Sequence, residues 1–284
     1  LELVFQRTLG PVVVATQGYA SPETKQIYYR SRELCHMVGE TEDTCPVLFG
    51  VFLFETGRAR HQRAMDAAKE LLKHARHVQD SGGHVAGRIA LGVSLVHTGR
   101  QSLANQEIEQ TIALYDPERH QPLAFRYGLE FGTTANAFRA WNLWLLGYPD
   151  QAIEYGRRTL VLLDKIKHPF SESRCLDWNA VLHAFRGEWS IVHERASDIM
   201  KLAGEHGFEL VLAAGQIMQG AATVKIGQSS VGLQQIRDGL NAYRATGGRF
   251  HGTYYLAILA LALHEEGLPE EGIEVLQDAA DLIE

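Results

Sequence analysis

The sequence predicts an all-α fold, a right-handed superhelical solenoid of about seven antiparallel helical hairpins. Two observations carry this prediction. Through the long segments, apolar residues recur at helical rather than alternating spacing, which favours amphipathic helices over strands. Between those segments a glycine recurs at a nearly constant interval, as expected where a helix ends in the left-handed conformation that glycine accepts. The seven glycines, separated by 39, 42, 48, 40, 40 and 40 residues, are Gly18, Gly57, Gly99, Gly147, Gly187, Gly227 and Gly267.

Each of these turns is expected to separate the first helix of a hairpin from the second. In chain order they read "TQGYASPE", "FETGRARH", "VHTGRQSL", "LLGYPDQA", "FRGEWSIV", "KIGQSSVG" and "EEGLPEEG". The second turn is followed by an apolar stripe made of Ala64, Ala68, Leu71, Ala75 and Val78. The third is followed by another, made of Leu103, Ile108, Ile112 and Tyr115. In the fourth turn, Pro149 suits the first turn of a helix and Asp150 favours the helix dipole at that end.

Small residues on the second helices predict close packing between helices. They are Ala104, Ala152, Gly156, Gly232, Gly239 and Gly272. Small side chains at this spacing let two helices approach closely, as a hairpin that stacks on its neighbour requires. Each glycine within a helix costs about 1 kcal/mol of helix propensity. Packing is therefore expected to offset that loss.

One interval breaks the period. The 48 residues between Gly99 and Gly147 exceed the other intervals by about eight, and the surplus falls in "YDPERHQPLAFRYG", residues 115–128. A surplus confined to one repeat predicts a protruding loop or a short extra helix, where functional residues concentrate.

This insertion and the helix after it supply the predicted binding site for a ligand or partner, which consists of His120, Arg126, Tyr127, Arg139 and Trp141. Arginine and aromatic side chains dominate recognition surfaces. The alternative, that the aromatic residues simply fill the junction between hairpins, stays open.

Composition excludes several classes of function. The chain has 284 residues and a formal charge of -7, from 27 basic and 34 acidic residues without long runs of either sign, so we expect no nucleic-acid partner. Its apolar runs are too short for a membrane span, and we expect no membrane contact. Three cysteines without C-x-x-C spacing predict free thiols in a reducing cytoplasm. The start, "LELVFQRTLG", lacks the pattern of a signal peptide. We expect residues 1–284 to form a single repeat domain, a piece of a longer polypeptide.

Candidate chemical groups do not form a recognisable catalytic or metal motif. His74 and His77 lie three residues apart on a predicted helix, but a zinc site needs a third or fourth ligand. Cysteine–histidine pairs can be formed from Cys35 and His36, or from Cys175 with His168 or His183. Nothing in the sequence signals an activated thiolate in either place. The sequence therefore predicts no enzyme, no metal and no cofactor.

The phrase "HPFSES", residues 168–173, has two interpretations. His168 could make a polar contact with a ligand or partner. Alternatively, Pro169 begins a helix and Phe170 packs against the previous hairpin, and we favour this interpretation because proline suits the first helical turn.

The unit "ANAFRAWNLWLLGYPDQAIEYGRRTLVLLDKI" resembles a tetratricopeptide repeat through Gly147, Tyr148, Ala152 and Tyr155. Its period near 40 exceeds the usual 34, which implies longer helices, as in the repeat regions of large signal-transducing ATPases. Several phrases between Leu1 and Leu263 also resemble the carboxy-terminal repeats of bacterial multidomain proteins of the class III nucleotide cyclase, signalling ATPase or transcriptional-regulator type. They are "LGPVVVATQGYASPETKQIYYRSRELC", "ALYDPERHQPLAFRYG", "LWLLGYPDQAIEYG" and "HPFSES". This resemblance implies a regulatory or sensory array.

The expected function is a non-catalytic module of a larger cytoplasmic regulator that binds a protein or peptide, including other domains of the same polypeptide, and transmits a signal. The first helices would line the concave face. One alternative is a small-molecule sensor whose ligand alters the superhelix curvature, which a pocket near Arg126 and Arg139 would support. Another is a scaffold for self-association through terminal hairpin faces. No phosphate-loop motif occurs in these 284 residues, so a nucleotide-hydrolysing part would lie outside them.

Overall fold

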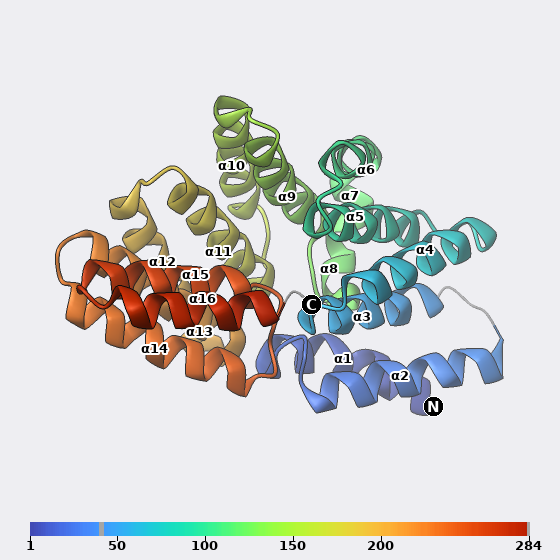
Figure 1. The fold of residues 1–284 in the computed structure, drawn as a ribbon. Coiled ribbons are helices and arrows are strands. Elements are labelled where there is room, and N and C mark those ends of the chain that lie inside the picture. The colour runs from blue at the N-terminus through green and yellow to red at the C-terminus, as the bar shows by residue number, and fades with distance from the viewer. Residues whose placement is uncertain (40–42, 283–284) are drawn as a thin grey trace. The chain divides into compact units, whose positions relative to one another are not determined.

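Helices account for all regular secondary structure in the part of the chain that the computed structural model describes, residues 1–39 and 43–282 (Figure 1). The helices fall into two compact units, Leu1–Cys175 and Leu176–Glu284. The boundary lies within α11 (Pro169–Phe185). The predicted all-α array of helical hairpins is confirmed. The prediction of one repeat domain over residues 1–284 stays a prediction.

Unit 1 contains four hairpins and the insertion. The hairpins are α1 (Glu2–Gln17) with α2 (Pro22–Val38), α3 (Thr44–Gly57) with α4 (His61–His77), α5 (Ser81–His97) with α6 (Gln101–Leu114), and α9 (Phe131–Leu145) with α10 (Pro149–Leu163). Between the third and fourth hairpins lie three short elements, α7 (Pro117–His120), the 3-10 helix η1 (Gln121–Leu123) and α8 (Ala124–Tyr127). Because α6 packs directly against α9, the insertion is added to the array and does not interrupt it.

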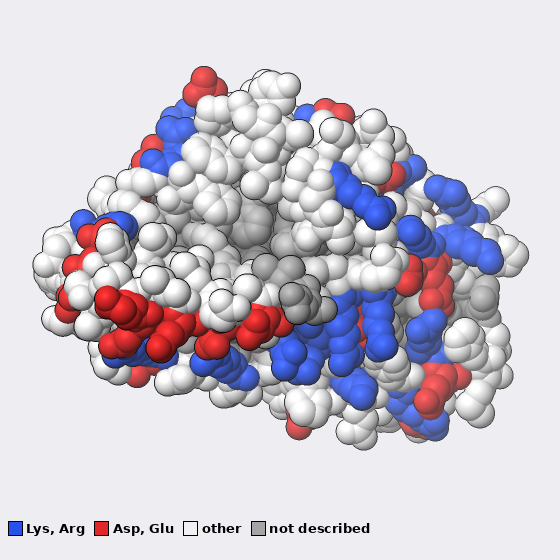
Figure 2. Space-filling view, viewed as in Figure 1, with Lys and Arg blue, Asp and Glu red and all other residues white. Residues whose placement is uncertain are grey.

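In the second unit the same pattern continues. After α11 follow α12 (Trp189–His206), α13 (Glu209–Lys225), α14 (Ser229–Ala245), α15 (Gly252–Glu265) and α16 (Pro269–Asp281). Figure 2 shows acidic side chains gathered along α16. Two of them, Glu270 and Glu271, occupy the first turn of that helix, where negative charge favours the helix dipole.

Six of the seven predicted glycine turns have positive φ angles, between 73° and 91°, as a left-handed or related conformation requires. The exception is Gly57, which is the last residue of α3, and the positive φ of that turn falls on Ala59 at 55°. Gly57 is needed for a different reason. A Cβ atom at this position would lie 2.6 Å from the Cβ of Tyr19, so the glycine allows the first turn to pack against α3.

Burial confirms one predicted apolar stripe and corrects the other. On α4, Ala64, Ala68, Leu71 and Ala75 are all buried, and Val78, the residue after the helix, is half-buried. On α6, the buried residues are Ala104, Ile108 and Thr111, whereas Leu103 is 50% exposed. The prediction for Leu103 is wrong because the buried side of α6 is centred one residue further along, on its small residue Ala104.

Close packing through small residues is clearest between α13 and α14. A Cβ atom on Gly232 would lie only 2.5 Å from the carbonyl oxygen of Gly220. In the last hairpin, a Cβ atom on Gly272 would lie 3.1 Å from the carbonyl oxygen of Ala260. Gly232 is therefore required by backbone contact between neighbouring helices, and Gly272 lies at a close helix contact, as predicted.

Candidate binding pocket and insertion

The insertion folds as a small capped unit. The side chain of Asp116 accepts a hydrogen bond from the backbone N–H of Glu118 at 3.0 Å and so caps α7, which Pro117 begins. The predicted site residue His120 is buried, and its Nδ1 accepts a hydrogen bond from the backbone N–H of Asp116 at 2.9 Å. Burial and the neighbouring Arg119 lower the pKa of His120. The imidazole therefore serves the turn as a neutral acceptor.

Aromatic residues attach the insertion to the hairpins. Tyr127 is 1% exposed, and its ring packs edge to face against Phe49 of α3 at 5.6 Å and Phe131 of α9 at 5.0 Å. Trp141, also buried, packs against Phe138 at 5.5 Å. Tyr127 therefore occupies a junction between helices, as the alternative interpretation describes, whereas this ring contact of Trp141 lies within α9 itself.

The two predicted arginines pair with different carboxylates. Arg126 of α8 lies 2.9 Å from the carboxylate of Asp43, and its side chain is 30% exposed. Arg139 of α9 is buried, pairs with Glu109 of α6, and donates a hydrogen bond to the side chain of Asn105 at 2.8 Å. Both arginines thus hold parts of unit 1 together. Their expected role in binding a partner stays a prediction.

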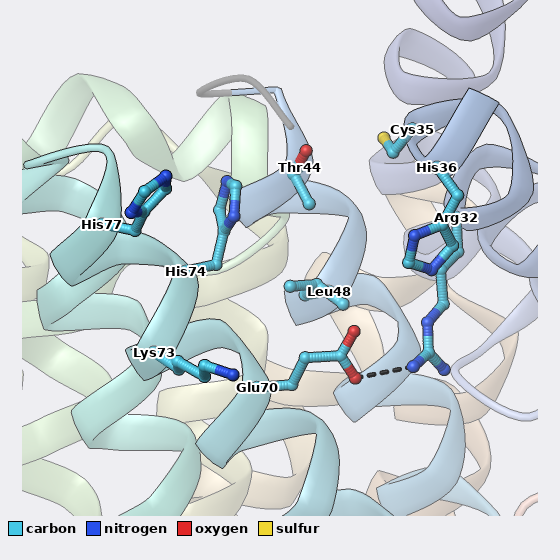
Figure 3. Close-up of a pocket in the computed structure, with 9 residues that line it drawn as sticks. All are labelled: Arg32, Cys35, His36, Thr44, Leu48, Glu70, Lys73, His74 and His77. Carbon is cyan, nitrogen blue, oxygen red and sulfur yellow. Dashed lines mark hydrogen bonds and ion pairs between the residues drawn. The ribbon is translucent and has the colours of Figure 1, made fainter. Parts of the chain in front are cut away.

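A cavity of about 440 Å³ lies elsewhere in unit 1, between α2, α3 and α4 (Figure 3). Among the residues that the structure describes, it is lined by Arg32, Cys35, His36, Thr44, Leu48, Glu70, Lys73, His74 and His77. None of the five predicted site residues belongs to this lining. The pocket that the sensor hypothesis places near Arg126 and Arg139 is therefore not this cavity.

The cavity wall combines an ion pair with several polar groups. A nitrogen of the Arg32 guanidinium lies 2.6 Å from a carboxylate oxygen of Glu70, which joins α2 to α4 (Figure 3). The deeper wall is formed by Leu48 of α3 and by Cys35, both buried. Burial raises the pKa of the Cys35 thiol, although a hydrogen bond with Thr44 acts in the opposite direction. A neutral thiol is a poor nucleophile, so the cavity offers no activated cysteine at this position.

The cavity brings together two residue pairs that are far apart in the sequence. Figure 3 shows His74 and His77 on α4 facing Cys35 and His36 on α2 across the cavity. Within the described ranges, no three His, Cys, Asp or Glu side chains are grouped so that they could hold a metal ion.

The second candidate cysteine has no histidine partner of the proposed kind. Cys175 is completely buried, and this burial raises the pKa of its thiol to about 12. The Nδ1 of His168 lies 2.8 Å from the hydroxyl oxygen of Ser171, and that of His183 lies 2.6 Å from the carboxylate of Glu188. Pro169 begins α11, as the favoured interpretation of "HPFSES" predicts.

No helix within the described part of the chain is both long and apolar enough to cross a bilayer.

Comparison with known proteins shows what this fold is. No family model matches the chain. An uncharacterized protein of Rhizobium meliloti (strain 1021) is 24% identical over 286 residues, which cover 98% of this chain and 27% of that protein. The chain thus spans about a quarter of the length of this relative.

Solved structures match at lower identity. A Rap protein complexed with Competence and Sporulation Factor has a TM-score of 0.62 at 10% identity, and the match covers 99% of this chain and 91% of that one. A signal transduction ATPase with numerous domains and a tetratricopeptide repeat sensor, from Pyrococcus horikoshii, has a TM-score of 0.54 at 13% identity, covering 93% of this chain and 40% of that one. At these identities the likeness shows the fold alone. The chain is a tetratricopeptide-like helical repeat region.

Proposed function

We propose that this chain is a non-catalytic repeat module that binds a protein or peptide and transmits the effect of binding within a larger cytoplasmic regulatory polypeptide. The extended match to a Rap protein solved with a bound factor supports a binding role for the array. The relative from Rhizobium meliloti, of which the matched region is 27%, supports a setting in a longer polypeptide. The resemblance to the repeats of multidomain signalling proteins points in the same direction.

One observation carries the proposal: the insertion presents an aromatic side chain to solvent. Phe125 of α8 is 66% exposed although its ring contacts His168 edge to face at 4.9 Å, a contact that restricts its orientation. The partly exposed Arg126 follows it in the sequence. Aromatic residues and arginine supply most of the binding energy at protein interfaces, and a side chain already held in place loses less entropy on binding.

Of the predicted site residues in the insertion, one is partly exposed and two are buried. Arg126 can contact a partner directly, whereas Tyr127 and His120 are buried and hold α8 and α7 in place. The contact surface that we propose therefore consists of Phe125 and Arg126, supported by the other residues of the insertion.

A peptide library displayed on phage and selected against residues 1–284 tests the proposal. Enriched peptides are synthesised, and their affinities are measured by calorimetry. Phe125→Ala is expected to weaken binding roughly tenfold or more, as at an interface hot spot. Tyr148→Ala is the matched control, because Tyr148 is a 52% exposed aromatic residue of the same unit outside the insertion; it is expected to change affinity less than twofold, which is the range for residues outside a hot spot. Failure to enrich any peptide, or equal affinity for Phe125→Ala and wild type, would refute the proposal.

A further inference from the structure

No residue of α8 belongs to the described lining of the cavity between α2, α3 and α4. Most of the groups that line it donate hydrogen bonds or carry positive charge. Arg32 and His36 come from α2, and Lys73 and His77 come from α4 (Figure 3). Glu70 is the only carboxylate among the described lining residues, and its charge is neutralised by Arg32, whose guanidinium nitrogen lies 2.6 Å from a carboxylate oxygen of Glu70. The charge that remains is positive.

Lys73 supplies that charge. It is exposed at the rim of the cavity, and it forms no ion pair or hydrogen bond within the described part of the chain. Arg32 uses one terminal nitrogen for Glu70, while its Nε and its other terminal nitrogen donate to no described residue. Arginine presents five N–H donors in a planar fork, so a ligand can bind to the same guanidinium beside Glu70.

The N-terminus of α3 adds an electric field that favours an anion in the cavity. Thr44, which lines the cavity, is the first residue of α3, a helix of 14 residues. The positive end of the α3 dipole therefore lies at the cavity wall, where it stabilises negative charge. Leu48, one turn further along α3, gives the wall an apolar patch that reduces competition from water.

Histidine side chains complete the donor set. His36 and His77 are exposed on opposite sides of the cavity, and each imidazole can donate a hydrogen bond to an anion. We propose that this cavity binds the anionic group of a small ligand, a phosphate or a carboxylate, through Lys73 and the remaining donors of Arg32, beside Glu70, with His36 and His77 as further donors. This proposal concerns a surface other than α8 and does not depend on the proposed function.

Inorganic phosphate and acetate serve as the two probes, titrated into residues 1–284 at low ionic strength while the ring-proton NMR signals of His36 and His77 are followed. His36→Gln and His77→Gln assign those signals. A saturable shift with a dissociation constant on the order of 1 mM is expected for at least one probe. Saturation by phosphate alone assigns the site to phosphate-bearing ligands, and saturation by acetate as well extends it to carboxylates.

Two lysines on one helix provide the decisive comparison. Lys73→Ala is expected to weaken binding roughly fivefold, the scale of one partly exposed charged contact. Lys69→Ala removes an equally exposed charge one turn earlier on α4, outside the cavity lining, and is expected to have less than a twofold effect. Neither substitution removes a buried side chain, and circular dichroism checks that the variants are folded.

The proposal is overturned if neither probe gives a saturable shift, or if Lys73→Ala and Lys69→Ala weaken binding equally.

Discussion

The contact between Gly220 and Gly232 makes the stability of unit 2 depend on the absence of one methyl group. In Gly232→Ala, the new Cβ atom would lie 2.5 Å from the carbonyl oxygen of Gly220 and 2.7 Å from the backbone nitrogen of Val224. A Cβ atom essentially never lies closer than 3.0 Å to a heavy atom to which it is not bonded. Helices α13 and α14 would therefore have to separate by at least about 0.5 Å.

The expected magnitude is a difference between two opposing effects. Alanine is a better helix former than glycine by about 1 kcal/mol, which favours the variant. Overpacking typically costs about 1–3 kcal/mol, and the upper part of that range applies because the obstructing atoms belong to the backbone and cannot rotate away. We expect Gly232→Ala to lower the free energy of unfolding by about 2 kcal/mol.

Gly204 provides the matched control. It lies exposed within α12 of the same unit, and a Cβ atom there would meet no other atom within 4 Å. The same substitution, Gly204→Ala, should therefore show only the gain in helix propensity and raise the free energy of unfolding by about 1 kcal/mol. Urea unfolding monitored by circular dichroism measures both values. If Gly232→Ala proved as stable as wild type, or if both variants shifted stability in the same direction, the close-packing argument would be wrong.

Three further predictions concern buried polar groups of unit 1. Burial lowers the pKa of His97 and of His168 to about 4, so acidification protonates these residues in the unfolded chain first. The free energy of unfolding should therefore fall between pH 6.5 and 4, by up to about 3 kcal/mol for each residue. Urea unfolding midpoints across this range check the prediction, and a double His→Gln variant that shows the same loss would contradict it. Glu130 accepts hydrogen bonds from two backbone amides in the first turn of α9, so Glu130→Ala should cost about 2 kcal/mol in urea unfolding, whereas a cost near zero would argue against the cap. Because burial raises the thiol pKa of Cys175 to about 12, iodoacetamide should label this residue only after unfolding, and mass spectrometry that finds rapid labelling of the folded chain would refute its burial.

The hairpin array was predictable because its signals are local. A glycine that ends a helix and an apolar period of about 3.6 residues depend only on neighbouring residues, and both can be read without knowledge of packing. Gly57 shows where this stops. Its neighbours in the sequence resemble those of the other turn glycines, but Gly57 makes room for Tyr19, which belongs to the turn between α1 and α2. A contact with a distant segment cannot be inferred from the residues around Gly57.

The insertion was found for the same reason, since an interval of 48 stands out among intervals near 40. The roles of its residues could not be predicted. Tyr127 and Phe125 are both aromatic and lie two positions apart on α8, yet one is 1% exposed and the other 66%. A helix of four residues has no periodicity from which its buried side can be inferred, so the contacts of α8 with other helices, including α1, α3 and Phe131 of α9, determine which ring faces solvent.

The cavity suggests how candidate sites in such arrays can be found from sequence. Residues separated by about one repeat occupy equivalent positions on successive hairpins, and stacking brings them together. Gly18 and Gly57 are 39 residues apart, and the ion-paired Arg32 and Glu70, which face the same cavity, are separated by 38.

The same relation holds in the second unit. Lys225 and Glu265 form an ion pair across a separation of 40 residues, which equals the spacing of Gly227 and Gly267. If only neighbours in the sequence are compared, Cys35 and His36 are not associated with His74 and His77. If about one repeat length is added to positions 35 and 36, the result falls close to His74 and His77. This works because residues one repeat apart in a stacked array lie on adjacent hairpins and contact one another.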